Sequence, residues 1–319
     1  EILIGLVGSE MCIRDSHKTN EKPIDLKLED MFGKAPRTIM NDHTVQETFA
    51  EPEYQAGNLL KYLQNVLQLE GVACKDWLTN KVDRSVTGRI AMQQTTGSIQ
   101  LPLNDCAVVA LDFQGNHGIA TSLGHAPAAA LADAAKGSVL AITEALTNIV
   151  FAAIDGGIHS VSLSANWMWP CKNEGEDARP YRAVEAASDY AQALGINIPT
   201  GKDSLSMTQK YRDGELVYAP GTVIITAAAE VSDIRKSVSP ALKHTKSQLV
   251  YVDMSRSAFN LGGSSFAQTL GFVGSNVPTV ESADYFIKAF TAVQELINAG
   301  KVLAGHDISC LLYTSPSPR

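Results

Sequence analysis

Residues 137–155 (GSVLAITEALTNIVFAAID) are the most informative stretch of this sequence for the fold. Apolar side chains surround almost every side of a helix drawn through them, which predicts a buried helix. The polar residues fall on one narrow stripe, and they are Thr143, Glu144, Thr147 and Asn148. Because a buried carboxylate needs a partner, we expect Glu144 and Asn148 to direct oxygen atoms at a ligand. From the helix alone, an ordinary surface stripe is an equally good interpretation.

The flanking sequence predicts strands and helices in mixed order. Residues 105–112 (DCAVVALD) form an apolar run, which indicates a strand buried on both faces. A hairpin is expected about Asp213 and Gly214. Further strands are predicted at 160–169, 248–254 and 302–309, and helices at 53–68, 125–135, 180–194, 261–270 and 281–299. This mixture favours an α+β architecture over a strictly doubly wound sheet.

Composition excludes several classes of protein. The 319 residues carry a net charge of −8, which argues against a nucleic-acid binder that neutralises phosphates. No run of 18 apolar residues is present, so we expect no transmembrane helix. The five cysteines are scattered without a C-x-x-C pair, which argues against zinc and favours a reducing compartment. We therefore expect a cytoplasmic protein that binds neither nucleic acid nor membrane.

Two aspartates stand at the ends of predicted strands. Asp105 opens one strand, and Asp307 closes the last one together with Ser309, which would share its face. With Glu144 and Asn148 these aspartates would supply four oxygen ligands, a set typical of Mg²⁺ held together with phosphate oxygens. Taken singly, each aspartate is more simply explained as a solvated residue at the end of a strand.

Residues 199–207 (PTGKDSLSM) place a glycine before a lysine. The spacing excludes a phosphate-binding P-loop, and Asp203 stands where that loop needs Ser or Thr. What remains is either a plain turn or a glycine that allows close backbone approach beside polar groups. Residues 164–170 (SANWMWP) are typical of packing under a loop, with a pocket wall presenting Asn166 as the alternative.

Seven short segments stand out, and they are KVDRSVTG (81–88), PLNDCAVV (102–109), EALTN (144–148), SANWMW (164–169), GKDSLSM (201–207), LGGSSF (261–266) and GHDIS (305–309). The order and spacing of EALTN, NWMW and GKDSLSM are highly specific as a group. In these segments the chain resembles the large, multidomain phosphoribosylformylglycinamidine synthase family over about residues 18–309. The resemblance implies ATP- and glutamine-dependent conversion of formylglycinamide ribonucleotide to formylglycinamidine ribonucleotide, a step of purine biosynthesis.

The resemblance also implies a domain layout. Residues 17–90 would end an upstream synthase domain and form a connector. Residues 91–235 would form an N-terminal unit like that of aminoimidazole ribonucleotide synthase, a sheet with packed helices. Residues 236–309 would form part of a C-terminal-like α/β unit. Residues 1–16 and 310–319 resemble translated adapter sequence, so we expect an internal fragment with non-native ends.

The roles that the resemblance implies fall on two regions. An auxiliary site holding ADP would take magnesium ligands from Asp105, Glu144, Asn148 and Asp307, with nucleotide contacts from Asn104, Ser309 and, as a weaker match, Lys75. A possible active-site loop would reach the catalytic ATP and substrate site, and it comprises Gly201, Lys202, Asp203 and Ser204, with Asn166 nearby. The glutaminase and the remaining synthase domains would be partners in the same polypeptide, so the isolated chain is expected to be inactive. The alternatives are a non-catalytic nucleotide-binding scaffold and another ATP-using enzyme of the same superfamily.

Overall fold

The computed structural model describes residues 12–14, 25–27, 29, 33, 39, 41, 43–45, 47–74, 76–79 and 88–308. The chain divides into two compact units, residues 1–41 and residues 42–319. In the first unit, β1 (Cys12–Arg14) pairs antiparallel with β2 (Asp25–Lys27). All elements described below belong to the second unit.

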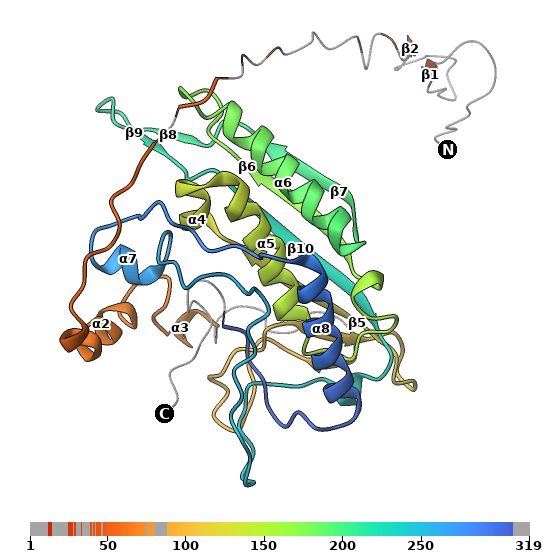
Figure 1. Ribbon diagram of the computed structural model, residues 1–319. Coiled ribbons are helices and arrows are strands. Elements are labelled where there is room, and N and C mark those ends of the chain that lie inside the picture. The colour runs from red at the N-terminus through yellow and green to blue at the C-terminus, as the bar shows by residue number, and fades with distance from the viewer. Residues whose placement is uncertain are drawn as a thin grey trace. The chain divides into compact units, whose positions relative to one another are not determined.

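A six-stranded mixed sheet forms the centre of the second unit (Figure 1). Its strand order is β3-β4-β5-β10-β6-β7, and every neighbouring pair is antiparallel except β6 and β7, which are parallel. The strands are β3 (Ile90–Met92), β4 (Ala107–Ala110), β5 (Gly118–His125), β6 (Ser162–Met168), β7 (Asn197–Ser204) and β10 (Thr222–Val231). The observed class is α+β, as the sequence predicts.

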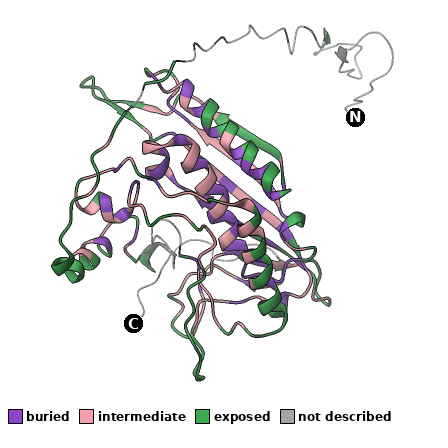
Figure 2. Ribbon diagram, in the orientation of Figure 1, coloured by how far each residue is buried: buried purple, intermediate pink, exposed green. Residues whose placement is uncertain are grey.

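Helix α5 (Ala134–Ile149) packs directly on β5 and β10, with α6 (Ala178–Leu194) beside it and α8 (Ala283–Asn298) beside α6. Figure 2 shows the sides of α5 and of the sheet that face each other as buried. A Cβ at Gly124 would lie 2.2 Å from the carbonyl oxygen of Ala141 and 2.3 Å from the amide nitrogen of Ala145. The helix backbone therefore rests on the strand where the strand has no side chain.

Helical cover on one face explains why the predicted two-sided burial of residues 105–112 is wrong. Burial alternates along β5, and on β4 Val108 is fully buried while Ala107 is exposed. Ile119 and Leu123, on the opposite face of β5, are 42% and 60% exposed. Only the face toward α5 belongs to the core.

Smaller elements complete the described chain. The predicted hairpin is confirmed as a separate two-stranded sheet of β8 (Thr208–Lys210) and β9 (Leu216–Tyr218). The helical elements are η1 (Ala56–Asn58), α2 (Leu59–Val66), α3 (Asp76–Thr79), α4 (Pro127–Ala132), η2 (Ile158–Ser160), η3 (Ile234–Lys236) and α7 (Ser265–Thr269).

The predicted helices form, but their ends differ from the predictions. Helix α5 begins three residues earlier than expected because Asp133 caps it by accepting the N–H of Lys136. It ends at Ile149, and Ile154 instead forms an isolated bridge with Val231 of β10. Helix α6 ends before Gly195, whose φ of 66° is the left-handed conformation that favours glycine.

Two predicted strands are wrong. Residues 248–254 and the described part of 302–309 have no regular secondary structure. Leu249 is 97% exposed, and within the described residues no strand lies beside its segment to complete a hydrogen-bonded ladder. Apolar composition alone is therefore not enough to predict a strand in either segment.

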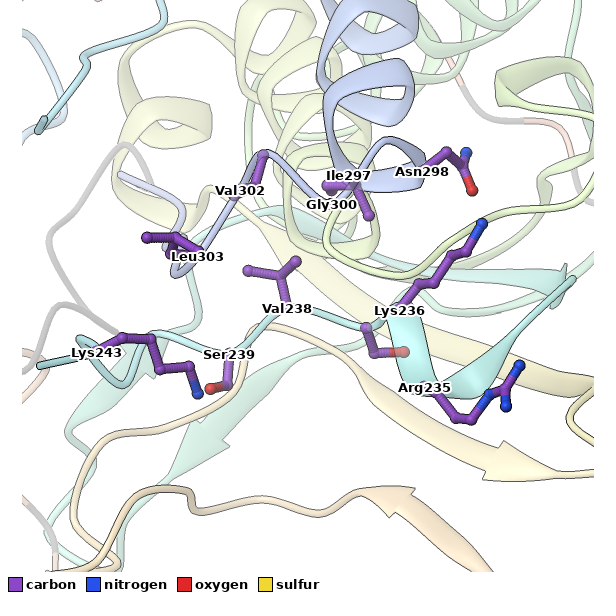
Figure 3. A pocket seen from close by; sticks show the side chains of 11 residues that line it. Arg235, Lys236, Val238, Ser239, Lys243, Ile297, Asn298, Gly300, Val302 and Leu303 are labelled. Carbon is purple, nitrogen blue, oxygen red and sulfur yellow. The ribbon is translucent and has the colours of Figure 1, made fainter. Parts of the chain in front are cut away.

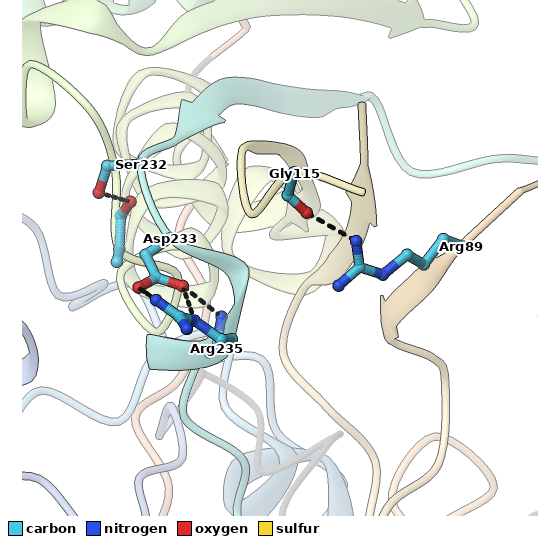
Figure 4. A network of polar contacts seen from close by, with 6 residues as sticks. Arg89, Gly115, Ser232, Asp233 and Arg235 are labelled. Carbon is cyan, nitrogen blue, oxygen red and sulfur yellow. Dashed lines mark hydrogen bonds and ion pairs between the residues drawn. The ribbon is translucent and has the colours of Figure 1, made fainter. Parts of the chain in front are cut away.

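Polar contacts fix the segments at one end of the sheet (Figure 4). The Arg89 guanidinium donates to the carbonyl oxygen of Gly115 at 2.6 Å. After β10, Ser232 donates its hydroxyl to the carbonyl of Ala153, and Asp233 binds the Arg235 guanidinium through both carboxylate oxygens. The Ser232 contact joins the end of β10 to the chain that follows α5, whereas the Asp233–Arg235 contact is local to η3.

Candidate functional site

Two residues of the polar stripe on α5, Glu144 and Asn148, are buried, so the surface-stripe interpretation is wrong for them. Glu144 and Asn148 lie one turn apart and are only 8% and 6% exposed. Glu144 accepts the backbone N–H of His125 through Oε2 at 3.1 Å, and Asn148 donates Nδ2 to the carbonyl of Leu123 at 2.9 Å. Both side chains are therefore held at the end of β5.

The oxygen of the Asn148 amide is the feature most suggestive of a ligand. Its nitrogen is occupied by Leu123, while Oδ1 is buried and accepts no hydrogen bond within the described residues. Leaving a buried acceptor unpaired is costly, and such an atom in a native fold calls for an explanation. An oxygen held in this way fits a cation ligand.

A second pair lies at the start of β4. Asp105 Oδ1 is 2.7 Å from Nδ1 of His306, and the two side chains are 1% and 17% exposed. Both carboxylate oxygens of Asp105 are buried, and the backbone of Asp307 lies close enough to the carboxyl group to lower its pKa. Burial raises the pKa of the Asp105 carboxyl above its usual value, although the contact with His306 and the backbone donors oppose that rise.

The segment that carries Asp307 reaches this position without forming a strand. The N–H of Gly305 donates to the carbonyl of Ser239, and a Cβ at Gly305 would lie 2.3 Å from the ring of Phe151. Asp307 itself is 8% exposed. The segment is therefore held close to the chain that leaves α5. Asp307 lies in no strand, and the predicted shared face with Ser309 is untested because Ser309 lies outside the described residues.

The predicted nucleotide contacts are described only in part. Asn104 donates Nδ2 to the carbonyl of Gln93 at 2.8 Å, and its Oδ1 is buried without a hydrogen bond in the described part of the chain. Asn104 therefore resembles Asn148 in presenting a fixed oxygen. Lys75 and Ser309 lie outside the described residues.

The described residues do not assemble a finished metal centre. No three His, Cys, Asp or Glu side chains among them come close enough together to hold a metal ion. The predicted ligands instead form two pairs, Asp105 with the Asp307 segment and Glu144 with Asn148. The magnesium site thus stays a prediction.

The possible active-site loop is a strand. Gly201–Ser204 are the last four residues of β7. They pair with β6 in parallel register, and Lys202 stands opposite Asn166. A Cβ at Gly201 would lie 2.2 Å from the carbonyl oxygen of Ala165, so this glycine allows close approach to β6. Lys202 donates to Ser204 at 2.9 Å, whereas Asn166 Oδ1 is buried without a hydrogen bond among the described residues.

The structure decides between packing and a pocket wall for Trp169, which directly follows β6. Trp169 is completely buried and donates Nε1 to Glu176 at 2.8 Å. Glu176 in turn lies 3.3 Å from the Arg179 guanidinium. This confirms the packing interpretation for Trp169, while Asn166 stays a candidate for ligand contact.

Sequence reasoning missed the role of β5, whose backbone positions Glu144 and Asn148. No pattern of residue types signals it, because the contacts involve main-chain atoms. It also missed a cavity of about 270 Å³ between the 235–243 segment and the end of α8 (Figure 3). Arg235, Lys236 and Lys243 line that cavity, and none of the predicted site residues does.

Comparison with known proteins places these residues in a family context. Residues 74–230 match the family model described as the FGAR-AT PurM_N-like domain. The human phosphoribosylformylglycinamidine synthase is 40% identical over 292 residues, or 90% of this chain. The probable chloroplastic/mitochondrial enzyme of Arabidopsis thaliana is 38% identical over 310 residues, or 96% of this chain. The chain spans 22% of the length of each of these relatives.

Solved structures show a weaker likeness. Those of T. maritima PurL complexed with ATP and with ADP are 14% and 15% identical to the chain, with TM-scores of 0.46 and 0.47. They cover 73% and 72% of this chain, and the match spans 33% of each of theirs. Within the described residues, no helix has both the length and the apolar character needed to cross a bilayer.

Proposed function

Since this chain belongs to the phosphoribosylformylglycinamidine synthase family, we propose that it carries a magnesium–nucleotide site of such an enzyme. The ligands of the ion are Asp105, Glu144, Asn148 and Asp307. Asn104 contacts the nucleotide, as do Lys75 and Ser309. The observation that carries the proposal is the buried, unpaired Oδ1 of Asn148 beside the buried carboxylate of Glu144.

Sheet register supports the convergence of the two pairs. In the antiparallel pairing of β4 with β5, Ala107 stands opposite Thr121. Asp105 lies two residues before Ala107, and Leu123, whose carbonyl binds Asn148, lies two residues after Thr121, so both flank the same end of this pairing. A bound cation would draw the carboxylates of both pairs to itself, since hard divalent cations prefer oxygen ligands.

The residues have distinct parts in this proposal. Mg²⁺, when bound, neutralises phosphate charge and fixes the phosphate oxygens in place. Glu144 and Asn148 hold their oxygens ready, because β5 already orients both side chains. Asn104, next to Asp105 in the sequence, offers a buried amide oxygen suited to a donor on the nucleotide.

For the whole enzyme we propose ATP- and glutamine-dependent ligation that converts formylglycinamide ribonucleotide to formylglycinamidine ribonucleotide in the cytoplasm. Residues 91–235 form the N-terminal-like unit and residues 236–309 part of the C-terminal-like unit of one synthase half. Glutaminase and further synthase domains are the partners in the same polypeptide. The plant relative is named chloroplastic/mitochondrial. The 319-residue chain alone makes no product.

A second role is proposed for the end of β7. Asn166 has an unpaired buried oxygen and stands opposite Lys202 on the neighbouring strand. Together with Asp203 they offer both signs of charge and an amide at an exposed sheet edge. This edge would contribute to the catalytic ATP and substrate site of the complete enzyme.

Calorimetric titration of the 319-residue chain with ADP tests the magnesium site. The wild-type chain should bind ADP in the presence of Mg²⁺ and lose most of that affinity in EDTA. Glu144→Gln removes the charge but keeps an acceptor for the His125 N–H, and Asn148→Ala removes the oxygen. Each should weaken Mg·ADP binding at least about tenfold, a difference of about 1.4 kcal/mol. Thr147→Ser on the same helix, which keeps its hydroxyl, is the matched control and should bind as the wild type does.

Wild-type affinity in both variants would contradict the proposed ligands. The same chain incubated with Mg·ATP distinguishes the alternatives. A scaffold or auxiliary site retains nucleotide without releasing phosphate, whereas steady phosphate release would indicate an independent ATP-using enzyme.

A further inference from the structure

We propose that His306 is a positioning residue of this site, which orients the Asp105 carboxylate for the cation and holds the Asp307 segment against it. The inference rests on the proposed magnesium–nucleotide function. No role for His306 follows from the predicted ligand set, which contains oxygen atoms alone.

The geometry places one dipeptide beside Asp105. Nδ1 of His306 lies 2.7 Å from Oδ1 of Asp105, and the backbone of the next residue, Asp307, lies close enough to oppose the rise in the pKa of the same carboxyl group. His306 therefore contacts Asp105 directly, and Asp307 is the next residue along the same segment.

A buried carboxylate ligand needs such a partner. The Asp105 side chain is 1% exposed, so water cannot orient it, and the His306 ring covers it while staying 17% exposed itself. Hydrogen-bonding partners behind the ligands of a metal fix their orientation, and their loss typically reduces metal affinity about 10–100-fold. His306 meets this description, because its imidazole contacts the buried Asp105 carboxylate.

The same contact joins two parts of the chain that are distant in sequence. The 302–308 segment has no regular structure, and its backbone is held by the bond from Gly305 to the Ser239 carbonyl. Adding the His306–Asp105 contact fixes the residue immediately before Asp307. Loss of the imidazole should therefore disturb two ligands together, Asp105 directly and Asp307 through the backbone.

Two substitutions separate positioning from simple packing. His306→Ala removes the donor. His306→Asn retains an amide N–H close to the position of Nδ1, so it should restore the contact with Asp105. His244→Ala is the matched control, because it removes an exposed histidine that also lies within residues 236–309.

The experiment measures Mn²⁺ binding to the 319-residue chain in the presence of ADP, from the loss of the free-ion signal in electron paramagnetic resonance. We expect His306→Ala to weaken Mn²⁺ binding about 10–100-fold, and His306→Asn and His244→Ala to stay within about threefold of the wild type. The urea midpoint of the metal-free protein is measured alongside, because a purely structural role would lower that midpoint and the Mn²⁺ affinity in parallel.

The outcomes are distinguishable. Wild-type Mn²⁺ affinity in His306→Ala overturns the inference and leaves the proposed function standing. Loss of Mn²⁺ binding in His306→Asn with an unchanged urea midpoint also overturns the inference. If His306→Ala does not fold, the Mn²⁺ affinity of His306→Asn is the deciding measurement. If the wild-type chain itself binds no Mn²⁺ with ADP, the proposed function fails and the inference with it.

Discussion

Substituting Gly124 by alanine should damage both the fold and the candidate site. The new Cβ would lie 2.2 Å from the Ala141 carbonyl oxygen and 2.3 Å from the Ala145 amide nitrogen, both atoms of the α5 backbone. Since neither atom belongs to a flexible side chain, the helix must move away from β5. The φ of Gly124 is not positive, so the lack of space alone opposes alanine at this position.

The size of the effect follows from the overpacking. Forcing an extra methyl group into a packed core costs about 1–3 kcal/mol. For a domain of about 150–250 residues, 1 kcal/mol shifts the melting temperature by about 2–4 °C. We therefore expect Gly124→Ala to lower the melting temperature by about 2–12 °C.

Nucleotide binding should fall as well, because Gly124 stands between the two backbone groups that orient the site. The Leu123 carbonyl binds Asn148, and the His125 N–H binds Glu144. Moving α5 outward lengthens both hydrogen bonds. Mg·ADP affinity should drop in the same variant.

Urea unfolding and Mg·ADP titration of Gly124→Ala test this reasoning, with Gly57→Ala as the control. Gly57 has no positive φ, and a Cβ there would meet no atom within 4 Å. The control should stay within about 0.5–1 kcal/mol of the wild type. An unchanged urea midpoint in Gly124→Ala would refute the direct contact of the helix backbone with β5.

Further outcomes follow from other buried and charged groups. Gln294 donates to two backbone carbonyls and accepts the N–H of Ile154. In a urea titration, Gln294→Ala should therefore lower the free energy of unfolding by about 1–3 kcal/mol or more. The control Glu295→Ala, at an exposed neighbour, should have little effect. Burial raises the pKa of the Cys106 thiol to about 12, so mass spectrometry after alkylation at pH 8 should find the exposed Cys74 modified and Cys106 protected until urea unfolds the chain. A neighbouring guanidinium lowers the pKa of Asp233 to about 2, so its stabilising contribution is present above the unfolded value of 3.8 and is lost as the pH falls through about 2. Asp233→Asn should therefore be less stable than the wild type near pH 7 and equally stable below about pH 2, and a constant difference across that range would contradict the assignment.

The sequence predicted the fold best where periodicity was long and unambiguous. The apolar surround of α5 and the 4, 3, 4 spacing of Phe286, Phe290, Val293 and Ile297 on α8 both identified helices that form. The buried face of a helix follows from the spacing of its apolar residues, and that spacing can be read from a single sequence. The α+β class followed from the same patterns.

Strand predictions depended on partners that the sequence does not display. Residues 248–254 are as apolar as β10, yet Leu249 is exposed because no described strand lies beside it. The end of β7 was expected to be a loop because it contains Gly201 and Lys202. Pairing with β6 overrides that local preference, and the glycine provides space for the neighbouring backbone.

The candidate site shows the same division. The oxygen-rich set was identified from residue types, and the burial of Glu144 and Asn148 agrees with it. The partners of those residues could not be predicted, since they are backbone groups of β5. The contact between Asp105 and His306 joins positions 201 residues apart in the sequence, and only the folded chain brings them together.

The central claim is that Asp105, Glu144, Asn148 and Asp307 share one divalent cation. Anomalous diffraction from crystals of the chain grown with Mn²⁺ and ADP locates that ion directly. We predict a single strong peak, octahedral in its ligands, with oxygens of these four residues and of the nucleotide phosphates around it. A peak bound to other residues, or nucleotide bound with no peak between α5 and the start of β4, would contradict the claim.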